Sequence, residues 1–325
     1  MTTQSAGPIG YRTDAEIRSQ PNLWRSAIAV AGEVLGLPVP GERVLLLGCG
    51  TSYYVGQAYA ALREQAGQGV TDALIASEVP DSYRPYDLVL AISRSGRSSE
   101  LLDAVRAFRG QQPDVPVTAL LGEQGTPLAD LVDTVVDLSF ADEQSLVQTR
   151  FPTTQLILLR TALAGHTDGP DQLGRRAIEA LPAQAEAALA GPIPEPQARQ
   201  LVVLGHGWGT AIAEEAALKV REAAAQWAEA YAVGEYRHGP IATCGPGTIV
   251  WGLDPLPTDI AEAVRGLGGQ VVDGGGEPLV ELVRLHRFAL ALATARGRDA
   301  DRPGSLNRSV VLPEAGVTEE PDADG

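Results

Sequence analysis

Two serine-rich turns carry the side chains best suited to holding an anion. Gly50-Thr51-Ser52 follows one apolar run, and Ser93-Arg94-Ser95-Gly96-Arg97-Ser98 follows another. Hydroxyls and free backbone N–H groups at the start of a helix, with the helix dipole behind them, form a phosphate cradle. Ordinary helix capping by serine and threonine is the alternative interpretation of either turn alone. Two such turns on neighbouring strands favour a ligand site.

A second group of candidates is a row of charged and polar side chains. Glu215, Lys219, Glu222 and Gln226 are spaced i, i+4, i+7 and i+11, which places them on one helical face. Most such rows are solvated faces with an ion pair. This segment is otherwise rich in alanine, which suits a closely packed helix and would leave the polar row lining a cleft. A partly buried carboxylate there can act as a general base.

A histidine in a turn is the third candidate. The chain has four histidines, and His238 lies between Arg237 and Gly239-Pro240. Such a position indicates a turn rather than a core face. A single loop histidine is usually solvated, so its position alone assigns it no role.

These candidates must be positioned by alternating strands and helices. Continuous apolar strands separated by amphipathic helices predict parallel sheets covered on both faces, an α/β fold. We expect two tandem, doubly wound, flavodoxin-like domains. Strands are expected at 44–47, 73–76, 88–92, 117–121, 134–138, 201–204, 248–253 and 270–273, and helices at 53–65, 99–108, 153–164, 210–226 and 279–294. The expected divisions are an N-terminal helical segment (1–40), a first domain (41–165), a linker helix (166–198), a second domain (199–312) and an acidic disordered tail (313–325).

An internal repeat supports two domains of one kind. Gly48-Cys49-Gly50 matches Gly205-His206-Gly207 at an offset of 205 − 48 = 157 residues. The identity is faint, and the shared order of strand, glycine turn and helix carries more weight than the letters.

Composition excludes several classes of function. The 325 residues carry a net charge of −16 and only two cysteines. An acidic chain with no basic stripe does not indicate a nucleic-acid binder, and two cysteines make neither a disulfide framework nor a zinc site. With no secretory leader and no long apolar run, a cytoplasmic protein that does not enter the membrane is expected.

Longer motifs resemble the isomerase half of glucosamine-6-phosphate synthase, a member of the tandem sugar isomerase (SIS) family. Residues 215–222 and 228–240 match that family's E-G-A-L-K-L-K-E and A-E-A-Y-A-A-G-E-L-K-H-G-P without a gap. The two serine turns resemble its C-G-T-S and S-Q-S-G-E-T. Residues 143–156 and 301–310 also resemble family segments, and Glu16-Ile17 with Gln20-Pro21 resembles the family's opening E-I-x-x-Q-P. The likeness therefore runs from about Glu16 to Val310.

The resemblance implies roles for individual residues. The sugar phosphate would be bound by Ser52, Ser93, Ser95 and Ser98, with Thr51, Arg94 and Leu146 also at the phosphate and sugar site. Glu222 would move a proton between C1 and C2 of the open-chain sugar. His238 would help to open the ring from across a dimer interface. Glu215, Lys219 and Arg308 would support the site.

Three departures from the family separate this chain from a complete synthase. The sequence matches no glutaminase domain with its nucleophilic cysteine, so a protein without glutaminase activity is expected. Arg94 and Arg97 replace a glutamine and a glutamate. Arg308 replaces a lysine, and because arginine stays protonated it cannot form an imine with a sugar.

The sequence therefore predicts an enzyme that needs no metal or other cofactor and binds a small phosphorylated sugar. It would be an aldose–ketose isomerase or an amino-sugar-phosphate isomerase or deaminase, working through an enediol or enolamine as a homodimer or higher oligomer. The alternatives are a deglycase of fructosamine 6-phosphates and a non-catalytic regulator that binds a sugar phosphate.

Overall fold

The computed structural model describes residues 9–166, 174–304 and 306–312. Within these ranges the chain has an α/β fold with two parallel sheets, as the sequence predicts. The acidic tail expected at 313–325 lies outside the described residues. The N-terminal segment contains helix α1 (Tyr11–Val30), and the segment between the sheets contains α5 (Arg175–Ala190).

The first sheet has five parallel strands in the order β2-β1-β3-β4-β5. Its central strands are buried along their whole length, which is why they appear in the sequence as unbroken apolar runs. The strands are β1 (Val44–Gly48), β2 (Thr71–Ile75), β3 (Leu88–Ser93), β4 (Val117–Leu121) and β5 (Thr134–Asp137), and the helices are α2 (Thr51–Gln65), α3 (Ser99–Gln111) and α4 (Arg150–Ala164).

The second sheet has four parallel strands in the order β7-β6-β8-β9. This is the order of the first four strands of the first sheet, with β6 in the place of β1. The strands are β6 (Gln200–Gly205), β7 (Ala228–Ala232), β8 (Thr248–Gly252) and β9 (Gln270–Val272), and the helices are α6 (Gly209–Ala224), α7 (Thr258–Gly266) and α8 (Pro278–Ala295).

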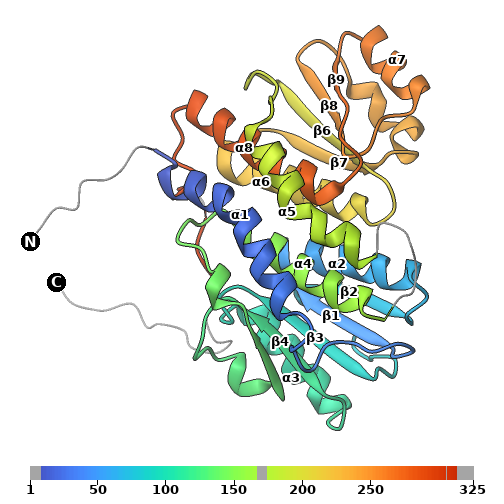
Figure 1. Cartoon of the computed structure of the whole chain (residues 1–325), viewed down its shortest axis with the longest axis vertical. Helices are drawn as coiled ribbons and strands as arrows, with labels where there is room; N and C mark the ends of the chain where they lie inside the picture. Colours follow the sequence, from blue (N-terminus) through green and yellow to red (C-terminus); the bar gives the residue numbers. More distant parts are fainter. Residues whose placement is uncertain (1–8, 167–173, 305, 313–325) are drawn as a thin grey trace, which may run out of the picture.

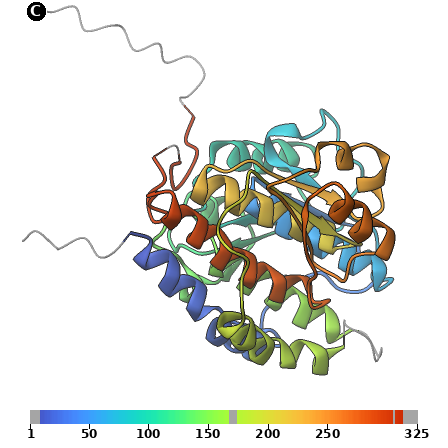
Figure 2. The ribbon, with the colours of Figure 1, turned by 90° about the horizontal axis from the view of Figure 1, so that it is seen from above.

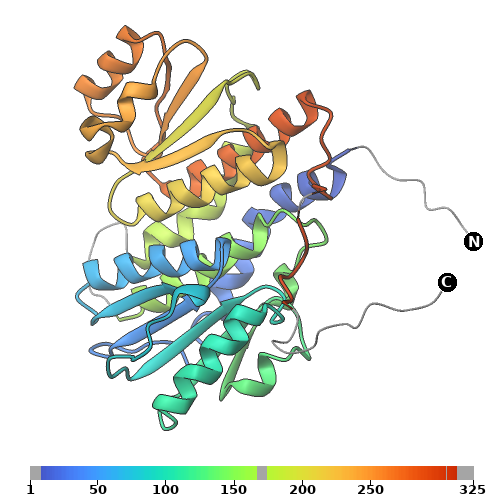
Figure 3. The ribbon, with the colours of Figure 1, turned by 180° about the vertical axis from the view of Figure 1, so that it is seen from behind.

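The two sheets enclose a shared layer of helices (Figure 1). The largest apolar cluster joins side chains from the inner faces of both sheets with α2, α4, α5, α6 and α8, while two smaller clusters lie under α3 and under α7 on the outer faces. Seen from above, α1 and α5 lie side by side along one edge (Figure 2). From behind, α2 and α6 pack against each other between the sheets (Figure 3).

The glycine turns of the internal repeat have the same backbone geometry. The second glycine of each turn has a positive φ, 52° at Gly50 and 55° at Gly207. A Cβ on the first glycine would meet the backbone of the following helix, at Ser52 for Gly48 and at Gly209 for Gly205. Glycine is therefore required twice in each turn, once for its conformation and once for the close approach of the helix.

One sequence expectation for the second sheet was wrong, and two elements were missed. Helix α6 ends at Ala224 because Ala225 has a left-handed φ of 45°, so Gln226 is not on the helical row with Glu222. The Gln226 side chain instead donates to the backbone carbonyls of Arg199 and Trp227. Strand β7 and helix α7 were not predicted, since both are short and most of β7 is exposed or only partly buried.

Candidate functional site

The two serine turns converge on one small cavity at the carboxyl edge of the first sheet. Strands β1 and β3 are hydrogen-bonded neighbours, so the turns that follow them meet. The cavity has a volume of about 50 Å³. Its lining contains all four predicted phosphate-binding serines and the predicted arginines Arg94 and Arg308. The full set of lining residues is Cys49, Ser52, Ile92, Ser93, Arg94, Ser95, Ser98, Leu101, Gln148 and Arg308.

The hydroxyls at this cavity are not used as helix caps. Helix α2 has Gly50 as its N-cap, and Ser98 precedes α3 without a side-chain capping bond. The Ser93 Oγ accepts from the backbone N–H of Gly96 at 2.9 Å and the Ser95 Oγ from that of Arg97 at 3.3 Å, so these two serines shape the turn. In the described part of the chain no hydrogen bond occupies the hydroxyls of Ser52 and Ser98. Simple capping therefore does not explain the turns.

The buried Arg94 and the partly buried Gln148 bring unsatisfied buried polar atoms to the cavity. Arg94 is 3% exposed and donates from one terminal nitrogen to the Ser145 carbonyl oxygen at 3.0 Å. Its Nε has no partner among the described residues, and neither does Oε1 of Gln148. Burial lowers the pKa of Arg94, and nearby carboxylates led by Glu143 oppose that shift. Unpaired buried polar atoms are costly, so a ligand that satisfies them would be stabilised there.

Gln148 was not recognised from the sequence. It lies inside the 143–156 stretch that resembles the family, between Glu143 and Thr149. Glu143 is fully buried and accepts from the backbone N–H groups of Thr149 and Arg150, at 2.6 and 2.8 Å. These contacts fix the loop that carries Gln148. By contrast, Leu146 is half-buried, does not line the cavity and donates its backbone N–H to the Asp301 carbonyl.

Arg308 closes the cavity from the C-terminal segment. Its guanidinium donates to both carboxylate oxygens of Asp142, at 2.8 and 2.9 Å, and to Glu123 at 2.7 Å. The backbone beyond it is bound to the start of α3, since Ser99 donates its N–H to the Val310 carbonyl. An arginine at this position therefore neutralises two carboxylates beside the serine turns, a role that needs its planar, fixed charge.

A buried charge network connects these turns to helix α6. Lys219 is 1% exposed and its Nζ donates to Thr51 Oγ1 at 2.8 Å and to Glu222 at 2.5 Å, with Glu215 at 3.5 Å. Thr51 precedes Ser52 of the cavity and is 3.3 Å from Glu215 Oε1. The polar row predicted on α6 is therefore buried between the two sheets, and the interpretation as a solvated surface face was wrong for Glu215 and Lys219.

Burial dominates the electrostatics of this network. It raises the pKa of Glu215 to about 7, against the opposing charge of Lys219 and with a further rise from Glu222. Burial acts to lower the pKa of Lys219, but the two carboxylates outweigh it, so the pKa is raised and the amine stays protonated. The Glu222 carboxylate differs from Glu215 because 19% of its side chain remains exposed. It is the member of the network that a ligand can reach.

The predicted site residue His238 and the turn residue Arg97 lie outside this cluster. His238 is exposed in a short 3₁₀ helix, Glu235–His238, after β7, and no described contact links it to Glu222 or to the serine turns. Arg97 is not among the lining residues of the cavity, and its Nε lies 3.8 Å from Glu123. Within one chain, the described residues therefore bring together the serine turns, Arg94, Arg308 and the α6 network, but not His238.

The family model of the SIS domain matches residues 40–164, the part of the chain that contains the first sheet and the serine turns. The matched segment is 125 of the 325 residues. Over 94% of its length the chain is 30% identical to glutamine–fructose-6-phosphate aminotransferase [isomerizing] of Caulobacter vibrioides, and over 91% it is 29% identical to the same enzyme of Aeropyrum pernix. The chain spans 59% and 54% of the lengths of these relatives.

Solved structures share the fold of this chain. Glucosamine-6-phosphate deaminase of Thermotoga maritima superposes with a TM-score of 0.78 at 22% identity, covering 93% of this chain and all of that one. Tagatose-6-phosphate ketose/aldose isomerase of Escherichia coli gives a TM-score of 0.69 at 21% identity, covering 90% and 95%. At these identities the likeness concerns the fold.

The described ranges contain neither a helix suited to span a membrane nor a cluster suited to bind a metal ion. No described helix is both long and apolar enough to cross a bilayer. Among the same residues, no group of three or more histidine, cysteine, aspartate or glutamate side chains is arranged to hold a metal ion.

Proposed function

We propose that this chain is an enzyme acting on a phosphorylated sugar, as an aldose–ketose isomerase or an amino-sugar-phosphate isomerase or deaminase. The observation that carries the proposal is the contact between the serine cavity and the α6 network. Thr51 belongs to the cavity turn and accepts from Lys219, which in turn holds Glu222. A phosphate in the cavity and a carboxylate on α6 would then hold one substrate from its two ends.

The proposed phosphate site has the chemistry of an anion cradle. The free hydroxyls of Ser52 and Ser98 and the unpaired Nε of Arg94 would donate to phosphate oxygens, together with backbone N–H groups at the start of α2. Arg308 would keep Glu123 and Asp142 from repelling the phosphate. Binding of this non-reacting group would position the sugar carbons against α6.

The proposed proton carrier is Glu222. Moving a carbonyl between C1 and C2 requires removal of a proton from one carbon and its return to the other, through an enediol. Lys219 would fix the orientation of the Glu222 carboxylate, and the exposed edge of Glu222 would meet the substrate. For an amino sugar the same shift gives a C2 imine, and addition of water to that imine would release ammonia.

The second sheet is proposed to be a second SIS-type module. Its strand order matches the first four strands of the first sheet, and its glycine turn has the same two constraints. Because His238 is exposed and away from the cavity of its own chain, we further propose that it completes the site of a second copy. Mixing Glu222→Gln and His238→Ala proteins should then restore part of the activity. No recovery after verified subunit exchange would remove His238 from the site.

The function is tested with a panel of hexose and hexosamine 6-phosphates, scored for isomerisation and for ammonia release. Turnover of at least one member is expected, with binding lost in a Ser93→Ala/Ser95→Ala variant that remains folded. Absence of both binding and turnover across the panel would overturn the proposal. Binding without turnover would instead indicate a non-catalytic regulator.

A further inference from the structure

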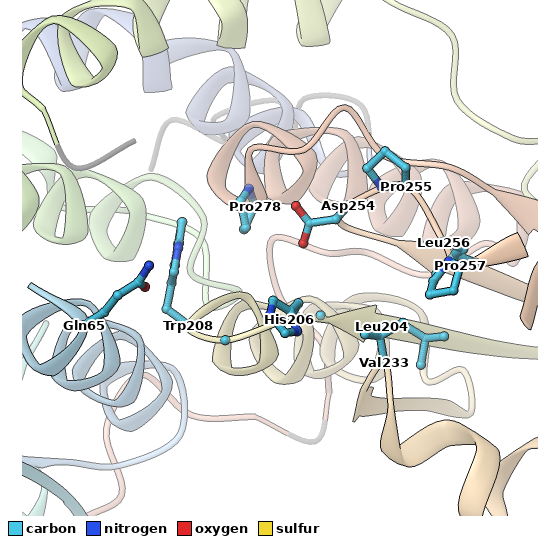
Figure 4. Close-up of a pocket in the computed structure, with 12 residues that line it drawn as sticks. Gln65, Leu204, His206, Trp208, Val233, Asp254, Pro255, Leu256, Pro257 and Pro278 are labelled. Carbon is cyan, nitrogen blue, oxygen red and sulfur yellow. The ribbon is translucent and has the colours of Figure 1, made fainter. Parts of the chain in front are cut away.

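A larger cavity lies at the carboxyl edge of the second sheet (Figure 4). Its volume is about 540 Å³, within the range of small-molecule sites. The loops after β6 and β8 form its main walls, and these strands are neighbours on either side of the point where the strand order reverses. Ligands of doubly wound sheets bind at that point. The position therefore corresponds to that of the serine cavity in the first sheet.

The side chains at this second edge differ from those at the first. At the repeat offset of 157, Thr51 corresponds to Trp208 and Ser52 to Gly209. None of the described residues lining the cavity is a serine, threonine, lysine or arginine. The walls are mostly apolar, with Trp208, Leu256 and three prolines. A phosphate here would find neither hydroxyl side chains nor a fixed cation, so this cavity does not suit the ligand of the first.

Asp254 is the charged group of the cavity. Its side chain is half-buried and has no hydrogen bond or ion pair within the described ranges, and Figure 4 shows its carboxylate directed into the space near His206. Burial raises its pKa, His206 opposes that shift, and the nearby carboxylates of Glu277 and Glu281 add to it. A carboxylate in an acidic, partly desolvated setting is best satisfied by a cation that also donates hydrogen bonds.

We propose that this cavity binds a small, unphosphorylated, amine-bearing molecule of sugar size. The ammonium group would pair with Asp254, hydroxyls would meet His206 and the amide of Gln65, and the carbon skeleton would lie against the apolar wall around Trp208. Gln65 ends α2, the helix that begins at the serine cavity, so the two sites lie at opposite ends of one helix. The proposal concerns a separate site and does not depend on the reaction proposed for the first.

The test measures binding of glucosamine by calorimetry to the full chain, with the Ser93→Ala/Ser95→Ala variant as a parallel sample. Glucosamine should bind both proteins equally, because the serine cavity is not involved. Glucose, which lacks the amine, should bind at least tenfold more weakly. Asp254→Asn should weaken glucosamine binding at least tenfold, whereas Asp259→Asn, a control on α7 whose partner is Arg237, should leave it unchanged.

Three results would overturn the proposal: no glucosamine binding, equal binding by the Asp254→Asn protein, or loss of binding in the serine variant. If Asp254→Asn does not fold, a crystal of the unmodified chain grown with glucosamine decides instead. Density with the amine beside Asp254 supports the site, and density only at the serine turns or nowhere refutes it. Binding of hexose 6-phosphates is a different measurement, so failure here leaves the proposed function to its own test.

Discussion

The carboxyl edges of the two sheets have glycine turns of the same backbone geometry but carry different side chains. Each edge has a glycine turn in which one glycine takes a positive φ and another admits the following helix. At the first edge the turn leads into Thr51 and Ser52 beside Arg94, and at the second into Trp208 and Gly209 beside Asp254. The two turns therefore share their geometry, while the side chains at a few positions give the cavities beside them different charge.

The largest effect should come from Glu222. This residue of α6 is connected to the first edge through Lys219, which donates to both Glu222 and Thr51. Glu222→Gln keeps the size of the side chain but removes its basicity, so turnover should fall by roughly two to four orders of magnitude with little change in substrate affinity. Steady-state kinetics on the active sugar phosphate measures this. Glu214→Gln, on the same helix but outside the Lys219 network, is the control. Near-normal turnover in Glu222→Gln would end its assignment as the base.

Removing the central cation should cost stability rather than chemistry alone. Lys219→Met leaves the fully buried Glu215 beside Glu222 without its counter-charge. Breaking a buried ion pair on one side costs about 3–5 kcal/mol of unfolding free energy. Glu215→Gln/Lys219→Met, which also removes the buried carboxylate, should recover a large part of that loss in urea unfolding. Equal losses in the single and double variants would contradict a charge origin.

A substitution at Ser52 tests the comparison between the edges directly. Ser52→Gly gives the first turn the residue found at position 209 of the second, and a hydrogen bond to a charged ligand contributes about 1.5–3 kcal/mol. Sugar-phosphate affinity should therefore fall roughly 10- to 100-fold by calorimetry. Ser52→Ala, which keeps the Cβ, should fall by a similar factor. A loss seen only with glycine would point to helix flexibility instead of the hydroxyl.

The smallest effect concerns His286, which is buried on α8. Burial, with a further contribution from Lys219, lowers its pKa from 6.5 to about 3. The unfolded chain gains this proton below pH 6.5 and the folded chain does not, so the stability due to neutral His286 is lost as pH falls from 6.5 toward 3. Relative to His286→Gln, the protein should lose about 2 kcal/mol between pH 7.5 and pH 5.

Glu215 acts in the opposite direction in the same experiment. Its folded pKa of about 7 lies above the ordinary 4.5, so its stabilising protonation is complete below pH 4.5 and is lost as pH rises through 7. Urea unfolding of His286→Gln and Glu215→Gln at pH 5 and 7.5 separates the two. Parallel pH profiles for the unmodified chain and His286→Gln would show that His286 does not titrate on unfolding.

The sequence by itself determined the α/β fold, most of the strands and the serine turns. Unbroken apolar strands such as β1 and β3 indicate a buried parallel sheet. That β1 and β3 are neighbours, so that their turns meet, is a result of the tertiary structure. The turn motifs, and not the overall composition, identified Ser52, Ser93, Ser95, Ser98 and Arg94 as a group. Those five residues do line one cavity.

Only the tertiary structure decided what surrounds those turns. Helical spacing put Glu215, Lys219 and Glu222 on one face, but spacing cannot tell a solvated face from one buried against Thr51 of another element. The same limit applies to Gln148 and to the cavity around Asp254, whose lining residues come from segments far apart in the chain. Local patterns fix local conformation, whereas burial and pairing of charge depend on which distant segments the fold brings into contact.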